Sequence, residues 1–273
     1  MQLDVDVMDA AACRAAWSPE PGDVWKLTDR AGVEHLMVCG DCRAPEVRAL
    51  VGEVDVLATD PPYGIAYASN WADIERKPGT KRRSRGAFGA DVLVDGWLAA
   101  WRPTRGAYVW ASWKRLGEVH AAMAAVDREP NHRVVWDKPH FTTGNLAQYG
   151  NQVEDCLVWL PSSAKCAWDK REGNVWREAF GRCIEGGRVG HPTQKPAGLF
   201  RRPLLHACPE GGLAADPFAG SGTLILAASQ VGGGRRAIGV EIDPEMFAVA
   251  LERLSQAGLI PVRTGRLPQP SAA

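Results

Sequence analysis

Short apolar segments alternate with helix-like segments along most of the chain, and this alternation is the feature that most restricts the fold. From apolar runs we expect strands at 36–39, 54–59, 106–112, 132–138, 154–160, 213–215 and 235–243, and from helical spacing we expect helices at 113–126, 197–208, 223–231 and 244–254. Strands that alternate with helices predict an α/β fold, a doubly wound and mostly parallel sheet that binds ligands at the carboxyl ends of its strands. Asp243 as N-cap and Pro244 at the first helical position predict the start of the last helix.

The size and composition fit one large domain over residues 1–273 that includes insertions. The chain has 273 residues, 45% hydrophobic and 23% charged, which is typical of a globular protein with a full core. Its start lacks the basic and apolar regions of a signal peptide, and its apolar runs fall short of the about 20 residues that cross a bilayer. We therefore expect a cytoplasmic protein without a membrane partner.

Two segments depart from the alternating pattern. Between 161 and 190 the sequence becomes mixed in charge and rich in Gly and Trp, which predicts a short inserted region. Residues 259–273 form a Pro-rich tail that we expect to be ordered only in part.

The cysteines and the charges narrow the class of function. Cys39 and Cys42 form the one CxxC pair among seven cysteines, and no second pair follows at zinc spacing. We interpret the cysteines as reduced thiols and expect no structural metal. The net charge is zero, which counts mildly against a dedicated nucleic-acid-binding protein. However, "ERKPGTKRRSR" at 75–85, within a loop at 65–90, holds six Lys or Arg residues.

The strand expected at 54–59 ends in an unusual turn, "TDPPYG". Two consecutive prolines have no N–H to donate to a strand partner, so the strand stops there. The turn presents a carboxylate, a rigid kink and an aromatic ring at the carboxyl end of the sheet, from Asp60, Pro61, Pro62 and Tyr63.

A glycine-rich turn follows the strand expected at 213–215. In "DPFAGSGT" (216–223) the glycines allow close approach of a ligand, and the following helix presents free N–H groups at its start. Glu241 ends the next strand, where an acid suits the two ribose hydroxyls of an adenosine-containing ligand. A helix-capping or surface acid is the alternative for Glu241. The turn is not GxGxxG, which disfavours a nicotinamide cofactor.

Together these motifs resemble those of the amino-group (N6-adenine or N4-cytosine) DNA methyltransferases. "DPFAGSGT" with "IGVEID" is similar to their S-adenosylmethionine site, "TDPPYG" to their catalytic motif, and "HPTQKP" (191–196) to the segment that covers the methionine end of the cofactor. The catalytic motif comes first and the cofactor motif last, as in the permuted β class. The resemblance spans about residues 35–255 and includes "VVWDKP" and "NQVEDCLVWL" as strand motifs.

The resemblance implies S-adenosylmethionine as cofactor and DNA as partner. The residues that it implies along the cofactor are Asp216, Phe218, Gly220, Ser221, Gly222 and Thr223, with Glu241 on the ribose, Asp41 at the adenine amino group, and Thr193 and Lys195 near the methionine. A solvated lysine is the alternative for Lys195.

The catalytic turn suits methylation of an exocyclic amine, whose lone pair is delocalised into the base. Asp60 accepts hydrogen bonds from the amine, a proline carbonyl held by the kink accepts another, and Tyr63 stacks on the base, which contributes about 1–3 kcal/mol. Positioning then supplies most of the catalysis. Such a base is reached only after base flipping or in a single strand.

Basic residues are the candidates for DNA contacts. The loop at 65–90 contributes Lys81, Arg82, Arg83 and Arg85, and the segment at 161–190, where the family has its target-recognition region, contributes Arg177, Arg182 and Arg188. Trp168 and Trp176 are further candidates, with a local core role as the alternative.

The target of the reaction stays open among several classes. Asp before "PPY" favours adenine N6 over cytosine N4, whereas the absence of a Pro-Cys dipeptide excludes cytosine-C5 chemistry. The motifs are also compatible with an RNA methyltransferase, and with a catalytically silent DNA-binding or partner subunit. The resemblance is compatible with a homodimer, and with either a solitary or phage-type enzyme or one half of a restriction-modification pair.

Overall fold

The described strands form one mixed sheet in the computed structural model. The structure describes residues 9–62, 96–139, 147, 149–164, 166–168, 170–179 and 194–268. Ten strands within these ranges lie in the order β10-β1-β2-β9-β8-β3-β4-β6-β5-β7. They are β1 (Asp23–Thr28), β2 (Glu34–Cys39), β3 (Val54–Thr59), β4 (Pro103–Ala111), β5 (His132–Asp137), β6 (Val153–Trp159), β7 (Val175–Arg177), β8 (Leu213–Asp216), β9 (Arg236–Glu241) and β10 (Ile260–Arg266).

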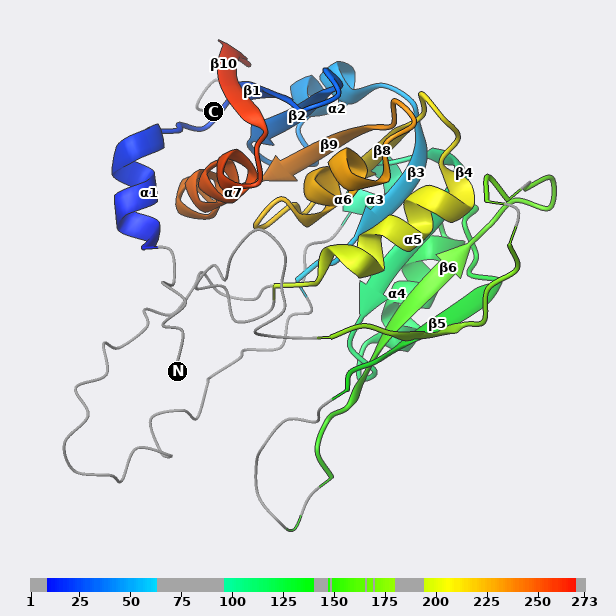
Figure 1. The fold of residues 1–273 in the computed structure, drawn as a ribbon. Coiled ribbons are helices and arrows are strands. Elements are labelled where there is room, and N and C mark those ends of the chain that lie inside the picture. Colours follow the sequence, from blue (N-terminus) through cyan, green and yellow to red (C-terminus); the bar gives the residue numbers. More distant parts are fainter. Residues whose placement is uncertain are drawn as a thin grey trace.

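Most of these strands run in one direction. The pairs β2–β9, β9–β8, β8–β3 and β3–β4 are parallel, so the carboxyl ends of five central strands meet at one edge of the sheet. Among the described strands, β1 and β6 run against the rest. The mixed, mostly parallel sheet confirms the predicted α/β class (Figure 1). The reversal of β6 brings its first residues, rather than its last, to the carboxyl edge of its neighbours.

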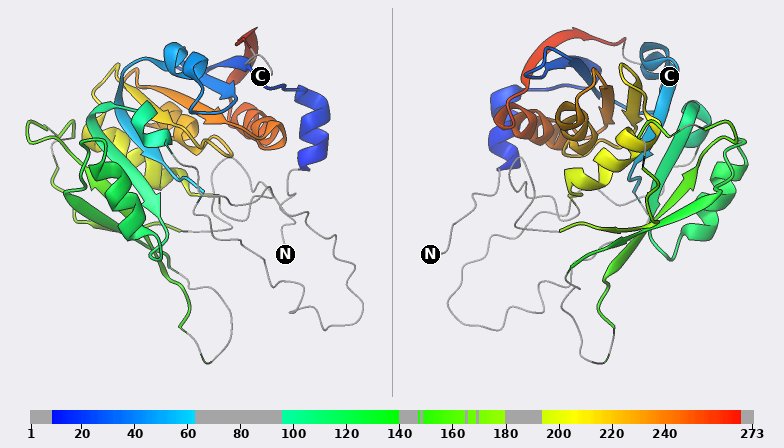
Figure 2. Two further views of the ribbon diagram at one scale, coloured as in Figure 1. Left: turned by 180° about the vertical axis from the view of Figure 1, so that it is seen from behind. Right: turned by 45° about the vertical axis from the view of Figure 1, so that its right-hand side comes forward.

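Helices cover both faces of the sheet, which is what a doubly wound fold requires. They are α1 (Ala10–Trp17), α2 (Pro45–Val51), α3 (Trp97–Ala100), α4 (Leu116–Ala124), α5 (Ala197–Ala207), α6 (Thr223–Val231) and α7 (Pro244–Gln256). Figure 2 shows these helices against the sheet from two further directions. One buried cluster joins the sheet to α5, α6 and α7, and a second joins it to α2, α3 and α4. No helix in the described ranges is long and apolar enough to span a membrane.

The central strands are apolar on both faces because each face is covered by helices. Along β4, Tyr108 and Trp110 belong to the cluster under α5–α7, while Ala107 and Val109 belong to the opposite cluster. This period of two is the geometry of a strand, so one continuous apolar run supplies both cores.

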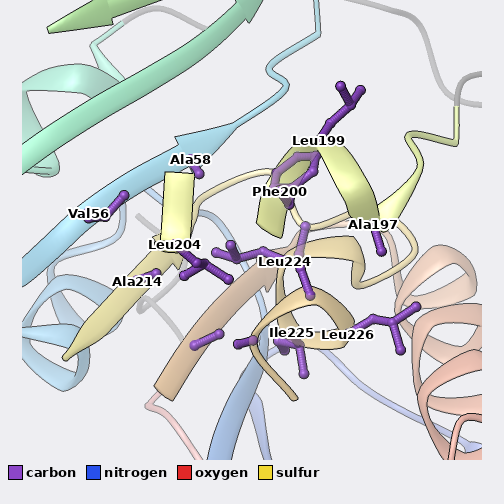
Figure 3. Packing of buried hydrophobic residues seen from close by; sticks show 14 of the residues in the cluster. Val56, Ala58, Ala197, Leu199, Phe200, Leu204, Ala214, Leu224, Ile225 and Leu226 are labelled. Carbon is purple, nitrogen blue, oxygen red and sulfur yellow. The ribbon is translucent and has the colours of Figure 1, made fainter. Parts of the chain in front are cut away.

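Small side chains on the strands let the helices lie close to the sheet. Leu204 of α5 and Leu224 of α6 pack beside Ala58 of β3 and Ala214 of β8 (Figure 3). Burying each leucine contributes about 1.5–3 kcal/mol, so this contact holds α5 and α6 firmly against the strands that carry the two motifs.

Helix capping follows the sequence prediction at α7. The Asp243 carboxylate accepts a hydrogen bond from the N–H of Glu245 at 2.9 Å, and Pro244 occupies the first turn. The sequence did not predict α1, which begins after Asp9, another carboxylate cap. Trp17 ties α1 to α7, since its Nε1 donates to Glu252 Oε2 at 2.8 Å.

Two segments that interrupt the alternating pattern contain strands. The tail at 259–273 was expected to be ordered only in part, and within it 260–266 forms β10, an edge strand antiparallel to β1. The buried carboxylate of Asp23 explains this, because it binds Arg263 at 3.2 Å and Arg266 at 2.8 Å. Within the segment expected as an insertion, β7 pairs with β5 and extends the sheet. The loop at 65–90 lies outside the described residues, and the insertion is described only in part.

Candidate functional site at the carboxyl edge of the sheet

The carboxyl ends of β2, β9, β8 and β3 bring four predicted acids to one edge. Gly40 N–H donates to the Glu241 carbonyl at 2.9 Å, which joins the ends of β2 and β9. Ala219 N–H donates to the Val240 carbonyl at 2.8 Å and folds the glycine turn over β9. The acids are Asp41, Asp60, Asp216 and Glu241, each at or just after a strand end.

A hydrogen bond links the catalytic motif to the glycine turn. Thr59 Oγ1 donates to Asp216 Oδ1 at 2.6 Å, and the Phe218 N–H donates to the same oxygen at 3.1 Å. Burial raises the pKa of Asp216 to about 7, against these two hydrogen bonds, which lower it. The Asp216 side chain therefore connects the glycine turn, through the Phe218 N–H, to Thr59, the residue before Asp60.

The glycine turn needs glycine at two positions. Gly220 and Gly222 have φ values of 50° and 77°, in the left-handed region that other residues rarely adopt. A Cβ on Gly222 would also lie 2.8 Å from Leu254 Cδ1. The backbone of the turn therefore lies close to α7, and helix α6 begins directly after the turn, at Thr223.

An arginine supports this turn from α7. Arg253 is completely buried, and its Nη1 lies 3.0 Å from the Ser221 carbonyl, 2.9 Å from Ser221 Oγ and 2.9 Å from Thr223 Oγ1. The hydroxyls of two predicted cofactor residues thus accept hydrogen bonds from beneath the turn. The sequence analysis missed Arg253. Helical spacing could have indicated that Arg253 is buried, because it stands one residue before Leu254 and three residues after Ala250, which are both buried in α7.

Glu241 holds the turn from the side. Its Oε2 accepts from the Gly220 N–H at 2.9 Å and its Oε1 accepts from the Asp243 N–H at 2.9 Å. Burial raises the pKa of Glu241 to about 7, although these hydrogen bonds lower it. Glu241 is half-buried, and it contacts the cap residue of α7. Its role toward a ribose stays a prediction.

Asp41 lies at the outer end of this edge. Its carboxylate accepts from the Arg43 N–H at 2.8 Å and pairs with Arg43 Nη2 at 2.6 Å. The hydrogen bonds from Arg43 hold the pKa of Asp41 below its ordinary value, so it is an ionised acceptor at neutral pH. Contact with an adenine amino group stays a prediction.

Lys195 contacts the predicted catalytic acid. Its Nζ lies 2.5 Å from Asp60 Oδ2 and 3.0 Å from Glu154 Oε2, and its side chain is 6% exposed. Burial lowers the pKa of Lys195, but the two carboxylates outweigh this and hold it above its usual range. The alternative of a solvated lysine is therefore wrong. A contact with the methionine carboxylate stays a prediction.

Glu154 is a residue that the sequence analysis did not single out. Its second oxygen lies 2.5 Å from Lys138 Nζ, so its carboxylate bridges two ammonium groups. Burial raises the pKa of Glu154, but Lys195 and Lys138 lower it to about 2. A charged residue at the start of an apolar strand, in a stretch that resembles a family strand motif, was the available signal.

The described candidates for DNA contacts differ in the exposure of their side chains. Arg177 ends β7 with an exposed side chain and pairs with Asp137 at 2.7 Å. Trp176 is buried against Tyr108 and Trp110, so its core role is confirmed. Trp168 is half-buried.

The structure describes both prolines of the catalytic turn, whereas eight of the predicted site residues lie outside the described ranges. Pro61 is buried and Pro62 half-buried directly after β3. The predicted residues outside the described ranges are Tyr63, Lys81, Arg82, Arg83, Arg85, Arg182, Arg188 and Thr193.

The two cysteines of the CxxC pair belong to the two different core clusters and are not bonded to each other. Cys39 packs in the cluster under α5–α7, whereas Cys42 packs in the opposite cluster. Burial raises the pKa of both thiols to about 12, which disfavours the thiolate that redox chemistry or metal binding requires. Both are free thiols, as interpreted from the sequence.

The donor set at this edge fits an adenosine-containing methyl donor. Carboxylates at Glu241 and Asp41 are acceptors for hydroxyl and amino groups, and the turn at Gly220 and Gly222 leaves no side chain between its backbone and a ligand. Asp60 directly follows Thr59, whose hydroxyl donates to Asp216.

This fold and edge define the class of the Rossmann-like methyltransferases. The structure of M1.HpyAVI in complex with S-adenosylmethionine matches with a TM-score of 0.58 and 20% identity, over 80% of this chain and 98% of that chain. The cytosine-N4-specific PvuII DNA methyltransferase matches with a TM-score of 0.53 and 15% identity, over 80% of this chain and 85% of that chain. These similarities establish the fold.

The sequence establishes the family. Residues 54–252 match the model of the N6/N4 methyltransferase family, described as DNA methylase, and the chain belongs to this family. The family is S-adenosylmethionine-dependent and includes the permuted β class that the motif order indicates.

Curated relatives match over part of their length. The type II methyltransferase M2.DpnII of Streptococcus pneumoniae is 28% identical over 162 residues, which are 54% of this chain and 59% of the relative. The DNA adenine methyltransferase YhdJ of Escherichia coli K12 is 40% identical over 88 residues, 32% of this chain and 29% of the relative. The chain thus covers less than two thirds of these relatives.

Proposed function

We propose that this chain is a DNA methyltransferase that transfers a methyl group from S-adenosylmethionine to the exocyclic amino group of a flipped-out base, with adenine N6 as the target. One observation carries the proposal. Asp60 stands at the carboxyl end of β3, directly after Thr59, whose hydroxyl binds Asp216 at the start of the glycine turn. The acceptor for an amine and the site for a cofactor are therefore held in one rigid unit.

The residues of the turn would hold the cofactor. Backbone at Gly220 to Thr223 would line it, Glu241 would accept the ribose hydroxyls, and Asp41 would accept the adenine amino group. When bound, S-adenosylmethionine supplies an electrophilic methyl group on a sulfonium. The buried Arg253 keeps the turn in place, so little reorganisation accompanies binding.

Asp60 would orient and activate the target amine. As an ionised acceptor, its carboxylate takes a hydrogen bond from the amine and favours a tetrahedral nitrogen with its lone pair aimed at the methyl group. Its negative charge also stabilises the positive charge that develops on that nitrogen. After transfer the nitrogen is strongly acidic and loses its proton readily, so no separately tuned base is needed. The reaction is a direct transfer with inversion and no covalent enzyme intermediate.

The target base is proposed from the motif and from the relatives. Asp rather than Ser precedes "PPY", and YhdJ is named a DNA adenine methyltransferase. Cytosine N4 is the second candidate, since PvuII DNA methyltransferase, which shares the fold, is cytosine-N4-specific. Several relatives are named type II methyltransferases, which supports a restriction-modification role in the cytoplasm.

We place the DNA on the side of the carboxyl edge. Arg177, at the end of β7, projects its exposed guanidinium from that edge of the sheet. Phosphate contacts from the basic residues of 65–90 and from Arg182 and Arg188 complete the proposal.

The test uses labelled S-adenosylmethionine and unmethylated genomic DNA, followed by digestion to nucleosides and identification of the product by mass. N6-methyladenine supports the proposal in full. N4-methylcytosine keeps the mechanism and overturns the choice of base. A protein that transfers no methyl group to DNA refutes the proposal, and parallel incubation with RNA then separates an RNA enzyme from a silent subunit.

A further inference from the structure

Four charged groups of alternating sign form a continuous chain at the carboxyl edge. Lys138 Nζ lies 2.5 Å from Glu154 Oε1, Glu154 Oε2 lies 3.0 Å from Lys195 Nζ, and Lys195 Nζ lies 2.5 Å from Asp60 Oδ2. Both lysine side chains are under 10% exposed. The chain of contacts is electrically neutral as a whole and ends on the predicted catalytic carboxylate.

The reversed direction of β6 creates this arrangement. Because β6 is antiparallel to β4 and β5, its first residues lie at the carboxyl edge, where Glu154 pairs in register with Trp136. Lys138 follows β5 at the same edge, and Lys195 enters from the segment just before α5. Three separate segments thus supply one cluster of charges next to Asp60, in which the two lysines are buried and Glu154 is half-buried.

Glu154 is a second carboxylate on the Lys195 ammonium, beside Asp60. An ammonium group buried with one carboxylate could follow that carboxylate as it rotates. Here a second carboxylate binds the same Nζ, and Lys138 in turn fixes that second carboxylate. Breaking a buried ion pair on one side is strongly unfavourable because it leaves an uncompensated charge, so the arrangement resists change.

We propose that Glu154 is a positioning residue: it holds the Lys195 ammonium against Asp60 Oδ2 and thereby fixes the orientation of the Asp60 carboxylate toward the target amine. The inference rests on the proposed function. In this proposal Glu154 acts through Lys195. Orientation matters because a displacement of about 1 Å in a reacting group can slow a reaction by about 10²-fold.

The experiment compares Glu154→Gln with the matched control Asp155→Asn. Asp155 is the next residue of β6, has a buried carboxylate and pairs with Arg133 at 2.6 Å, away from Lys195. Both changes remove one negative charge from the same strand. In single-turnover methylation at saturating S-adenosylmethionine and DNA, we expect Glu154→Gln to be slower by on the order of 10²-fold. We expect Asp155→Asn to remain within about threefold of the wild type and to leave the Kd for S-adenosylmethionine unchanged.

A double-mutant cycle with Lys195→Met identifies the route of the effect. If Glu154 acts through Lys195, adding Glu154→Gln to Lys195→Met changes the rate little further. Additive losses in the cycle, or equal losses in Glu154→Gln and Asp155→Asn, overturn the inference.

Acylation of the lysine amines gives a readout that does not depend on activity. Peptide mass spectrometry follows labelling of buried Lys195 relative to exposed Lys114. Glu154→Gln should accelerate Lys195 labelling at least several-fold, while Asp155→Asn should leave it unchanged. Unaltered Lys195 labelling in Glu154→Gln overturns the inference even where the wild type is active. A wild type that methylates no nucleic acid instead refutes the proposed function and the catalytic part of this inference, and labelling still decides whether Glu154 holds Lys195.

Discussion

Replacement of Arg253 by methionine removes the support beneath the glycine turn. Methionine keeps the length and apolar contacts of the arginine stem, so the change isolates the guanidinium. Nη1 faces three oxygens of Ser221 and Thr223, at 2.9–3.0 Å, but it carries two hydrogens and therefore makes two full hydrogen bonds at a time.

The expected loss follows from these two bonds. A hydrogen bond to a charged group contributes about 1.5–3 kcal/mol, so two contribute about 3–6 kcal/mol. The apolar methionine offsets part of this, since burying the guanidinium is itself costly. We expect the free energy of unfolding to fall by about 3 kcal/mol, measured by urea denaturation. We also expect the Kd for S-adenosylmethionine to rise about tenfold, which is about 1.4 kcal/mol, measured by calorimetry on folded protein.

Arg235→Met is the matched control for this prediction. Arg235 is also buried, and it donates to the Cys208 carbonyl at 2.9 Å and to the Gly232 carbonyl at 3.2 Å. It precedes β9, at the opposite edge of the sheet from the glycine turn. Its replacement should destabilise the protein by about 2 kcal/mol and leave the Kd unchanged. If both variants bind S-adenosylmethionine with the wild-type Kd, then Arg253 stabilises the core without shaping the turn, and the reasoning fails.

Three further predictions concern catalysis, DNA binding and pH. Asp60→Ala should abolish methyl transfer and leave the calorimetric Kd for S-adenosylmethionine nearly intact, whereas substantial residual activity would contradict the role of Asp60 as amine acceptor. The basic cluster of the loop at 65–90 consists of Lys81, Arg82, Arg83 and Arg85. Replacing these residues by alanine should weaken DNA binding and flatten its salt dependence, measured by titration at several salt concentrations. An unchanged salt slope would exclude phosphate contacts from this cluster. Burial raises the pKa of Glu241 from 4.5 to about 7. Between these two pH values the folded state binds a proton that the unfolded state has released. The contribution of Glu241 to stability is therefore present below pH 4.5 and is lost as the pH rises toward about 7. Glu241→Gln should remove that part of the slope in unfolding free energy measured from pH 4.5 to 7.5, and an identical slope in the variant would show that Glu241 does not cause it.

The sequence alone determined the features that depend on local backbone chemistry. Two prolines cannot continue a strand, so β3 ends at Thr59 as predicted. Asp243 followed by Pro244 specifies the start of a helix, and α7 begins there. The positive φ angles at Gly220 and Gly222 likewise follow from a turn that only glycine forms without strain. Because these preferences act within a few residues, the end of β3, the start of α7 and the glycine turn could be predicted.

Only the tertiary structure decided which charged groups are buried together. Glu154 reaches Lys195 because β6 runs against its neighbours, and no local preference encodes that direction. Arg253 belongs to α7, but its contacts with Ser221 and Thr223 join segments that are far apart in the sequence. Strand β10 forms because Asp23, far away along the chain, is buried where Arg263 and Arg266 can bind it. Such contacts join segments distant in sequence, and their stability depends on the desolvation of both partners, which only the folded arrangement sets.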